Sequence, residues 1–160
     1  MTIKVGDHLP HANLTKAGPE GPQPVDTESY FAGRKVALFS VPGAFTPTCS
    51  ARHLPGFVEK ADELKAKGVD EVACVSVNDA FVLQAWAASA GAEGKVTMLA
   101  DGNGDFADAL GLSADFSKFG MGKRGQRWSA IVDDGVVTEL NVEEPGAFSV
   151  SSAEFLLGQL

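Results

Sequence analysis

The 160-residue chain has few cysteines and no long apolar run, and each shortage excludes a class of protein. Its two cysteines, Cys49 and Cys74, are too few for a disulfide-stapled scaffold or for a metal site made of cysteines alone. The longest apolar stretch, residues 36–45, is broken by Pro42 and Gly43 and is far shorter than the ~20 residues of a membrane-spanning helix. We expect no membrane span, and any role of the thiols must be chemical.

Positive charge is also scarce. Thirteen Lys and Arg residues stand against 21 Asp and Glu, which gives a formal net charge of −8. This charge opposes binding to phosphate backbones and to acidic membrane surfaces, so we expect neither nucleic acid nor a membrane as partner. The amino-terminal residues do not resemble a leader sequence, which predicts a cytoplasmic protein. The length and the 44% hydrophobic content predict a single domain over residues 1–160.

Short apolar runs alternate with amphipathic stretches along the first two thirds of the chain. Residues 36–41 and 72–77 are typical of strands buried on both faces. Residues from Pro47 onward have helical spacing, and Asp79 is placed to cap a second helix. This order predicts parallel strands joined by helices. Residues 16–28, with three prolines and two glycines, predict a surface loop.

The remainder of the chain predicts an antiparallel addition and a closing helix. The expected elements are a strand at 97–100, a helical turn at 106–110, a hairpin of 128–132 with 136–140, and a helix from Ser152 to the end. Together with the parallel unit, they predict an α/β fold with a mixed central sheet and helices on both of its faces.

Several motifs resemble known sites and fail on their context. Residues 120–125 match GxGxxG but lead into a strand, whereas a dinucleotide-binding loop opens a helix. Residues 101–105 begin like a calcium loop, but the later ligand positions do not fit, so a plain turn is expected. His8, His11 and His53 are interpreted as surface histidines. We therefore expect neither a metal nor a cofactor.

The segment around Cys49 is different. Thr46 followed by Pro47 is a strong helix-start signal, which makes Cys49 the third helical residue. In a capping box that position carries Glu or Gln, so a thiolate could take the place of the carboxylate, with the Thr46 hydroxyl as its neighbour. The alternative is that Cys49 is an inert small residue in a helix cap.

A helix end is too weak to activate this thiol alone. It contributes about 0.3–1 kcal/mol at exposed sites, so a nearby cation is needed as well. Arg52 lies one helical turn from Cys49, whereas Arg124 and Arg127 would have to arrive from the distant hairpin region. Spacing alone does not choose among the three arginines.

Residues 42–57, PGAFTPTCSARHLPGF, resemble the active-site segment of peroxiredoxins of the type II or peroxiredoxin-5 class. The superfamily pattern PxxxTxxC is present as Pro42, Thr46 and Cys49. The similarity continues through most of the chain, including residues 74–81, 99–106 and 127–146. The resemblance implies a thioredoxin-like fold and an antioxidant thiol peroxidase that reduces hydrogen peroxide and organic hydroperoxides without metal, haem or flavin.

Roles follow from the resemblance, residue by residue. Cys49 would be the peroxidatic nucleophile that becomes a sulfenic acid, and Thr46 would donate to and accept from the peroxide and the thiolate. Pro42 would shield the site and Arg127 would supply the activating guanidinium, with Arg52 as the second choice. The resemblance also implies a non-covalent homodimer that packs near the active-site loops.

One departure from the family bears on how the enzyme is recycled. Animal members carry a resolving cysteine near the C-terminus, but the matching residues 148–151 contain none. Cys74 matches a second cysteine of plant type II members, whose reductants include glutaredoxin with glutathione and, in some cases, thioredoxin. Inside an apolar strand Cys74 is either an inert structural thiol or a resolving partner of Cys49.

Two other functions remain possible at this point. A peroxide sensor would use the same Cys49 thiolate but would pass its oxidation to partner proteins. A thioredoxin-like disulfide reductase would need CxxC, and residues 50–52, Ser-Ala-Arg, supply no second cysteine after Cys49.

Overall fold

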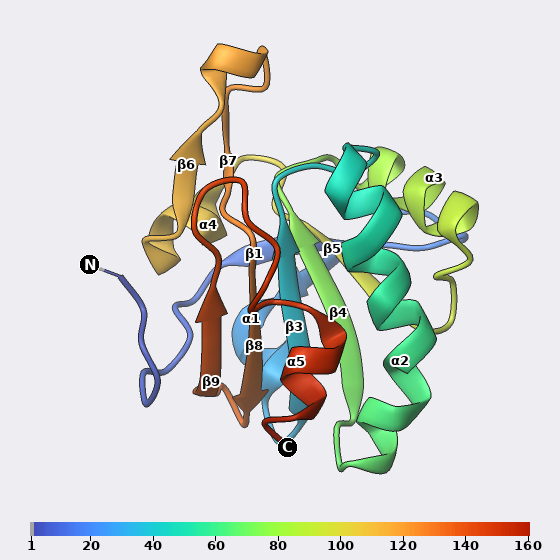
Figure 1. The fold of residues 1–160 in the computed structure, drawn as a ribbon, viewed down its shortest axis with the longest axis vertical. Helices are drawn as coiled ribbons and strands as arrows, with labels where there is room; N and C mark the ends of the chain where they lie inside the picture. Colours follow the sequence, from blue (N-terminus) through green and yellow to red (C-terminus); the bar gives the residue numbers. More distant parts are fainter. Residues whose placement is uncertain (1) are drawn as a thin grey trace.

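A seven-stranded mixed sheet forms the centre of the computed structural model, which describes residues 2–160 (Figure 1). Its strands lie in the order β2-β1-β5-β4-β3-β8-β9. The strands of this sheet are β1 (Asn13–Ala17), β2 (Gln23–Asp26), β3 (Lys35–Val41), β4 (Glu71–Ser76), β5 (Thr97–Ala100), β8 (Trp128–Asp133) and β9 (Val136–Val142). A separate two-stranded ribbon consists of β6 (Ser113–Asp115) and β7 (Lys123–Gly125).

Helices connect and cover the strands. They are α1 (Thr27–Phe31), the π-helix η1 (Cys49–His53), α2 (Leu54–Ala66), α3 (Ala80–Ala90), α4 (Asp105–Leu110), the 3-10 helix η2 (Ser117–Phe119) and α5 (Ala153–Leu157). Strands β3, β4 and β5 are parallel, as their crossover helices α2 and α3 require, whereas β8 pairs antiparallel with both β3 and β9. The expected combination of a parallel unit with an antiparallel hairpin is confirmed.

Strand β3 explains why both faces of the sheet are covered. Ala37, Phe39 and Val41 enter the apolar cluster that includes side chains of α2, α3 and α5. Val36 and Leu38 point the other way, into the cluster that includes side chains of α1 and α4. Since successive side chains of a strand alternate between faces, an uninterrupted apolar run is what such a buried position needs. The expected α/β fold with helices on both faces is confirmed.

Most of the sequence-based boundaries agree with the structure within a few residues. Asp79 caps α3 as expected, because its Oδ1 accepts a hydrogen bond from the Val82 N–H at 2.8 Å. Gly91 ends that helix at φ 67°, the left-handed conformation that glycine adopts without strain. Ser152 caps α5 through a hydrogen bond from the Phe155 N–H at 3.1 Å, but α5 ends at Leu157 and does not reach the last residue.

The expectation of a loop over residues 16–28 is wrong. Strand β1 ends at Ala17, the chain turns, and β2 and α1 occupy most of the rest. Proline has no backbone N–H to donate. Pro24 is tolerated because β2 is an outer strand of the sheet and has a neighbouring strand on one side only. The ribbon β6–β7 was also not expected. Its strand β7 takes up the second half of the GxGxxG segment, whose Gly120 and Gly122 lie in the turn before β7.

No helix within residues 2–160 has both the length and the apolar character to cross a membrane.

Candidate active site

The chain leaves β3 at Val41 and reaches Cys49 through a short loop at the carboxyl end of that strand (Figure 1). The backbone becomes helical at Pro47, so Cys49 is the third helical residue, as the spacing predicts. From Cys49 to His53 the helix is of the π type, and the Leu54 N–H bonds to the Cys49 carbonyl, five residues back. Such wider turns inside helices are frequent at functional sites, and this one begins at the cysteine.

Thr46 is close to the expected place, but its side chain does not cap the helix. Its Oγ1 donates to the Gly43 carbonyl at 2.6 Å, and its own carbonyl accepts from the Ser50 N–H at 2.9 Å. The prediction of a capping box with Thr46 as the cap is therefore wrong. Because the hydroxyl proton is used within the loop, the oxygen keeps lone pairs with which it can accept a further hydrogen bond.

Cys49 is fully buried, and a cation contacts its sulfur. Arg127 lies immediately before β8, and its Nη2 donates to the Cys49 Sγ at 3.1 Å. No carboxylate within residues 2–160 forms a salt bridge with Arg127. A Cys49 thiolate would thus be the anion that pairs with this guanidinium.

The other two arginines that the sequence left open have different positions. Arg124 donates through Nη1 to the Pro42 carbonyl at 3.2 Å and through Nε to the Met121 carbonyl at 2.9 Å, which ties the ribbon to the loop before Cys49. Arg52 is exposed and its guanidinium lies over the Phe148 ring at 4.7 Å. Pro42 is half-buried in the loop. Only Arg127 has a hydrogen bond to Sγ among the described residues.

His53 is a site residue that sequence reasoning missed. It is fully buried, which overturns the expectation of a surface histidine. Its Nε2 donates to the Ser151 carbonyl at 2.9 Å, and its Nδ1 accepts from the Arg127 Nη1 at 2.8 Å. Burial, followed by the charge of Arg127, lowers the pKa of His53 to about 3. His53 is therefore neutral, with one ring nitrogen free to orient Arg127.

A buried carboxylate fixes the loop that holds His53. Glu143 accepts backbone hydrogen bonds from Ser149, Val150 and Ser151, each at 2.8 Å, and a fourth from the Ser151 hydroxyl at 2.7 Å. Burial alone would raise the pKa of Glu143, but these hydrogen bonds bring it below its usual value. The result is a continuous set of contacts from Glu143 through Ser151 and His53 to Arg127 and the sulfur.

Cys74 lies in β4 and faces the same apolar cluster as Cys49. It is fully buried, and burial raises its pKa well above the usual range, with the neighbouring Cys49 acting in the same direction. Both cysteines are free thiols in this structure. The two thiols therefore have opposite surroundings, since Cys49 has a cation at its sulfur and Cys74 is kept protonated.

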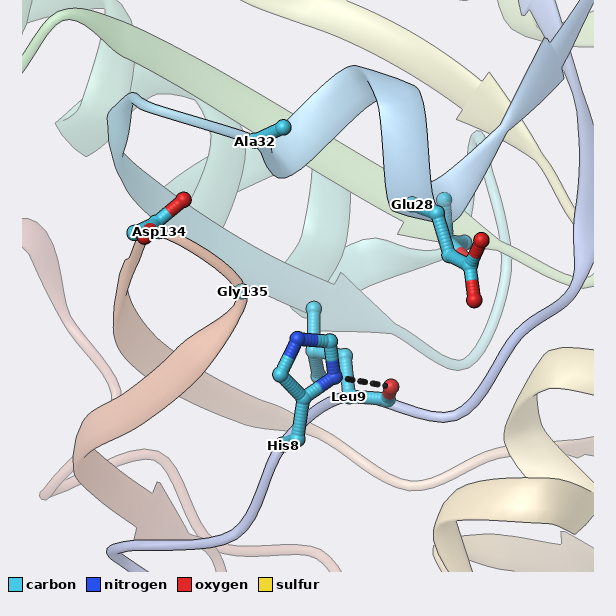
Figure 2. A pocket seen from close by; sticks show the side chains of 7 residues that line it. His8, Leu9, Glu28, Ala32, Asp134 and Gly135 are labelled. Carbon is cyan, nitrogen blue, oxygen red and sulfur yellow. Dashed lines mark hydrogen bonds between the residues drawn. The ribbon is translucent and has the colours of Figure 1, made fainter.

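A cavity at the other end of the sheet is an alternative site. It has a volume of about 190 Å³ and is lined by His8, Leu9, Thr27, Glu28, Ala32, Asp134 and Gly135 (Figure 2). His8 is exposed, and its Nδ1 bonds to the Leu9 carbonyl at 2.9 Å. No group of three metal-binding side chains occurs anywhere in residues 2–160. No cysteine lines this cavity, so we place the candidate site at Cys49.

Comparisons with known proteins point to one family. The family model described as Redoxin matches residues 4–157. The chain is 54% identical to peroxiredoxin-2E-2, chloroplastic, of Oryza sativa subsp. japonica over 99% of the chain and 73% of that protein. It is 47% identical to peroxiredoxin-2B of Arabidopsis thaliana, over 99% and 98%. The structure of reduced Prx3 with H2O2 from Vibrio vulnificus matches with a TM-score of 0.95 and 53% identity, over 99% of both chains.

Proposed function

The chain belongs to the Redoxin family and, within it, to the type II peroxiredoxins, thiol peroxidases that remove hydroperoxides, and we propose that Cys49 is its peroxidatic residue. The observation that carries this proposal is the hydrogen bond at 3.1 Å from the Arg127 guanidinium to the buried Cys49 sulfur. A thiolate is the reactive form of cysteine, and a guanidinium without a carboxylate partner stabilises it. This pairing supports the proposed peroxidatic role of Cys49.

In the first half of the reaction, the Cys49 thiolate attacks one oxygen of the hydroperoxide. The sulfur–oxygen bond forms as the O–O bond breaks, and the departing oxygen takes a proton to leave as water or an alcohol. Arg127 can stabilise the charge that develops on that oxygen, because its guanidinium already lies at the sulfur. The Thr46 hydroxyl adds an acceptor for the peroxide proton. Cys49 is left as a sulfenic acid.

The positions of Arg127 and His53 make this stabilisation available without rearrangement. The Arg127 Nη1 bonds to the His53 Nδ1, whereas Nη2 bonds to Sγ, so the two ends of the guanidinium have different partners. Since neutral His53 cannot repel the cation, it holds the guanidinium in place at no electrostatic cost. A donor that is already oriented contributes most in a site from which water is excluded.

Hydroperoxides are the substrate, and we propose that hydrogen peroxide is among them. The Vibrio vulnificus protein that this chain resembles is described in complex with H2O2. A steady-state assay with hydrogen peroxide and several organic hydroperoxides, each with thioredoxin and with glutaredoxin plus glutathione as reductant, tests the activity. Failure to consume any peroxide with either system would contradict the proposed function.

The second half of the reaction needs a thiol, and we propose an external one, glutathione with glutaredoxin or thioredoxin. Cys74 is protonated and fully buried in β4, which favours a structural role for it. Mass measurement of the intact protein after one equivalent of peroxide tests this assignment. Quantitative conversion to a Cys49–Cys74 disulfide would overturn it.

A peroxide sensor is the second candidate function, because it would use the same Cys49 chemistry. The two functions differ in turnover. Repeated consumption of peroxide with a thiol supply supports the enzyme, whereas a single stoichiometric oxidation that is passed to a partner protein supports the sensor.

We also propose that the protein forms a non-covalent homodimer through the active-site end. Three large apolar side chains there are exposed, namely Phe45 (54%), Phe81 (73%) and Phe119 (69%). Exposed aromatic side chains at one end of a protein favour an interaction surface. Sedimentation velocity at micromolar concentration should give a dimer, and Phe81→Asp should shift it towards monomer. A monomer in the unmodified protein would contradict the proposal.

A further inference from the structure

Arg52 is close to the active site but does not belong to the set of contacts around the sulfur. It lies on η1, three residues after Cys49, and is exposed. Within the described part of the chain its guanidinium has no hydrogen-bonded partner and no carboxylate within 4.0 Å. An arginine has five N–H donors in a planar arrangement that matches a carboxylate. All of these donors are available to a ligand.

Phe148 fixes where this guanidinium lies. Its ring is 4.7 Å from the Arg52 Cζ and 5.9 Å from the Arg127 Cζ, and it packs edge-on to His53 at 5.1 Å. One ring thus lies against both the guanidinium at the sulfur and the exposed guanidinium. Contact with the face of a ring holds an arginine without using its N–H donors. Arg52 is therefore held near the site with its hydrogen-bonding capacity unused.

The two substrates of the enzyme differ in what they gain from such a cation. A hydroperoxide is neutral and gains little from a charge outside the sulfur's immediate contacts. A thiol that carries a carboxylate is an anion, and the net charge of −8 repels it. In physiological salt, charges are screened over about 8–10 Å. A positive group within this distance of the reacting sulfur offsets the repulsion of an anionic thiol at the sulfur itself.

We propose that Arg52 binds a carboxylate of the thiol that reduces oxidised Cys49, so that the enzyme prefers anionic small-molecule thiols over neutral and cationic ones. This inference rests on the proposed peroxidase function. The thiol's sulfur attacks the sulfenic sulfur of Cys49, an S–S bond forms, and the S–O bond breaks. The hydroxyl group leaves with the thiol's proton as water. A second thiol then attacks the attached thiol, which releases a small-molecule disulfide and the Cys49 thiolate.

Two other roles for Arg52 make different predictions. If Arg52 helped to activate Cys49, its removal would slow the reaction with peroxide. If it acted only by supporting Phe148 and the adjacent loop, its removal would slow the reactions with all thiols alike. Only if Arg52 binds a carboxylate should the effect of its removal depend on the charge of the thiol.

The experiment separates the two half-reactions by rapid mixing. Trp86 provides a fluorescence signal beside Cys49, because its indole Nε1 donates to the Ser50 hydroxyl at 3.0 Å. Protein oxidised with one equivalent of hydrogen peroxide is mixed with glutathione, 2-mercaptoethanol or cysteamine, which carry a net negative, zero and positive charge. Rates of mixed-disulfide formation are compared at equal thiolate concentration for the unmodified protein, Arg52→Gln, Arg52→Glu and Arg52→Lys.

We expect Arg52→Gln to slow the reaction with glutathione about fivefold, which corresponds to the upper range for an exposed ion pair. The rate with 2-mercaptoethanol should stay within about twofold of the rate of the unmodified protein. Arg52→Glu should slow glutathione further and make cysteamine faster. Arg52→Lys should restore part of the glutathione rate, since it keeps the charge but not the planar donors. The rate of Cys49 oxidation by hydrogen peroxide should stay the same in all three variants.

Lys67→Glu is the matched control, because it makes the same charge change on an exposed residue at the far end of α2. It should leave the order of the three thiols unchanged. Equal slowing of all three thiols by Arg52→Gln, or an effect of Lys67→Glu as large as that of Arg52→Glu, would overturn the proposal. If the unmodified protein did not react with hydrogen peroxide at all, the proposed function itself would fail, and this outcome is distinct.

Discussion

The two ends of the central sheet each place a histidine near acidic residues, but they are built in opposite ways. At the carboxyl end of β3, fully buried His53 uses both ring nitrogens, one with Ser151 and one with Arg127. At the other end, exposed His8 borders a cavity of about 190 Å³ (Figure 2). The end that carries the proposed site is the one in which polar groups are buried and paired, rather than the one with this open space.

This difference has a physical basis. A buried polar group costs free energy unless it is paired, so the contacts from Glu143 to the Cys49 sulfur persist only because each group has a partner. Such a set of contacts holds a cation at one fixed position. His8 and the two carboxylates that line this cavity with it, Glu28 and Asp134, are exposed to solvent, where weak pairing costs little.

Removal of the nucleophile gives the largest expected effect. Cys49→Ser should reduce peroxidase activity to the background rate, because a serine hydroxyl is not ionised beside Arg127 at neutral pH. A steady-state peroxide assay measures this change. Cys74→Ser is the control, since the protonated thiol of Cys74 should contribute little to catalysis. Substantial activity in Cys49→Ser would contradict the assignment of the site to this end of the sheet.

Removal of the cation should have the next largest effect. Arg127→Ala takes away the donor to Sγ and should lower kcat/KM for peroxide by about 10²–10³, the usual loss for one donor of this kind. Pre-steady-state oxidation of Cys49 is the direct measurement, with Arg34→Ala as a control at a distant arginine that pairs with Glu71. Full activity of Arg127→Ala would return Arg52 to the first place among the candidate cations.

The extent to which sequence could predict this site depends on how far apart its parts lie in the chain. The loop and helix of residues 42–57 carry a local signal, so the position of Cys49 in the helix could be predicted. Arg127 comes from 78 residues away, and Ser151 from 98 residues beyond His53. Local spacing contains no information about which distant segment will cover a residue, so the contacts of His53 with Ser151 and Arg127 could not be predicted.

The one signal that could have identified His53 is its immediate surroundings. It is followed by Leu54 and lies four residues before Phe57, both of which are fully buried on the same stretch of helix. A residue on the apolar side of an amphipathic helix is buried with its neighbours. The resemblance to a family identified Arg127 where spacing left three arginines open, because a family pattern contains long-range contacts that a single periodicity does not.

Protonation of the chain at His53 links the stability of the fold to pH. The lowered pKa of His53, about 3, means that the unfolded chain binds a proton below pH 6.5 that the folded protein does not. The free energy of unfolding should therefore fall as the pH drops from 6.5 to 5, with a slope that approaches about 1.4 kcal/mol per pH unit at the lower end of this range. Glu143, whose pKa is lowered from 4.5, adds its own loss only at lower pH. Urea unfolding at pH 7, 6 and 5 measures the slope.

Two variants isolate the contribution of His53. In His53→Gln the side chain cannot titrate, so the slope between pH 6.5 and 5 should become nearly flat, and peroxidase activity at pH 7 should fall about tenfold as the hydrogen bond to Arg127 weakens. In His8→Gln, an exposed position away from the sulfur, the activity should match that of the unmodified protein. An equal slope in the unmodified protein and in His53→Gln would show that His53 becomes protonated in the folded state.

The smallest effect on activity is expected at the cavity. Gly135 has φ 80°, and a methyl group there would lie 2.7 Å from the His8 Nε2, so Gly135→Ala is strained in its backbone and crowds the ring. We expect it to lower the free energy of unfolding by about 1 kcal/mol or more, because alanine adopts positive φ at a cost. The activity per folded molecule should not change, since Gly135 joins β8 and β9 at the end of the sheet opposite Cys49. Urea unfolding and the peroxide assay on one preparation measure both quantities.

A loss of activity larger than the loss of folded protein would mean that the two ends of the sheet are coupled. No catalytic contact reaches this turn, so the disturbance would have to pass along β8 to Arg127.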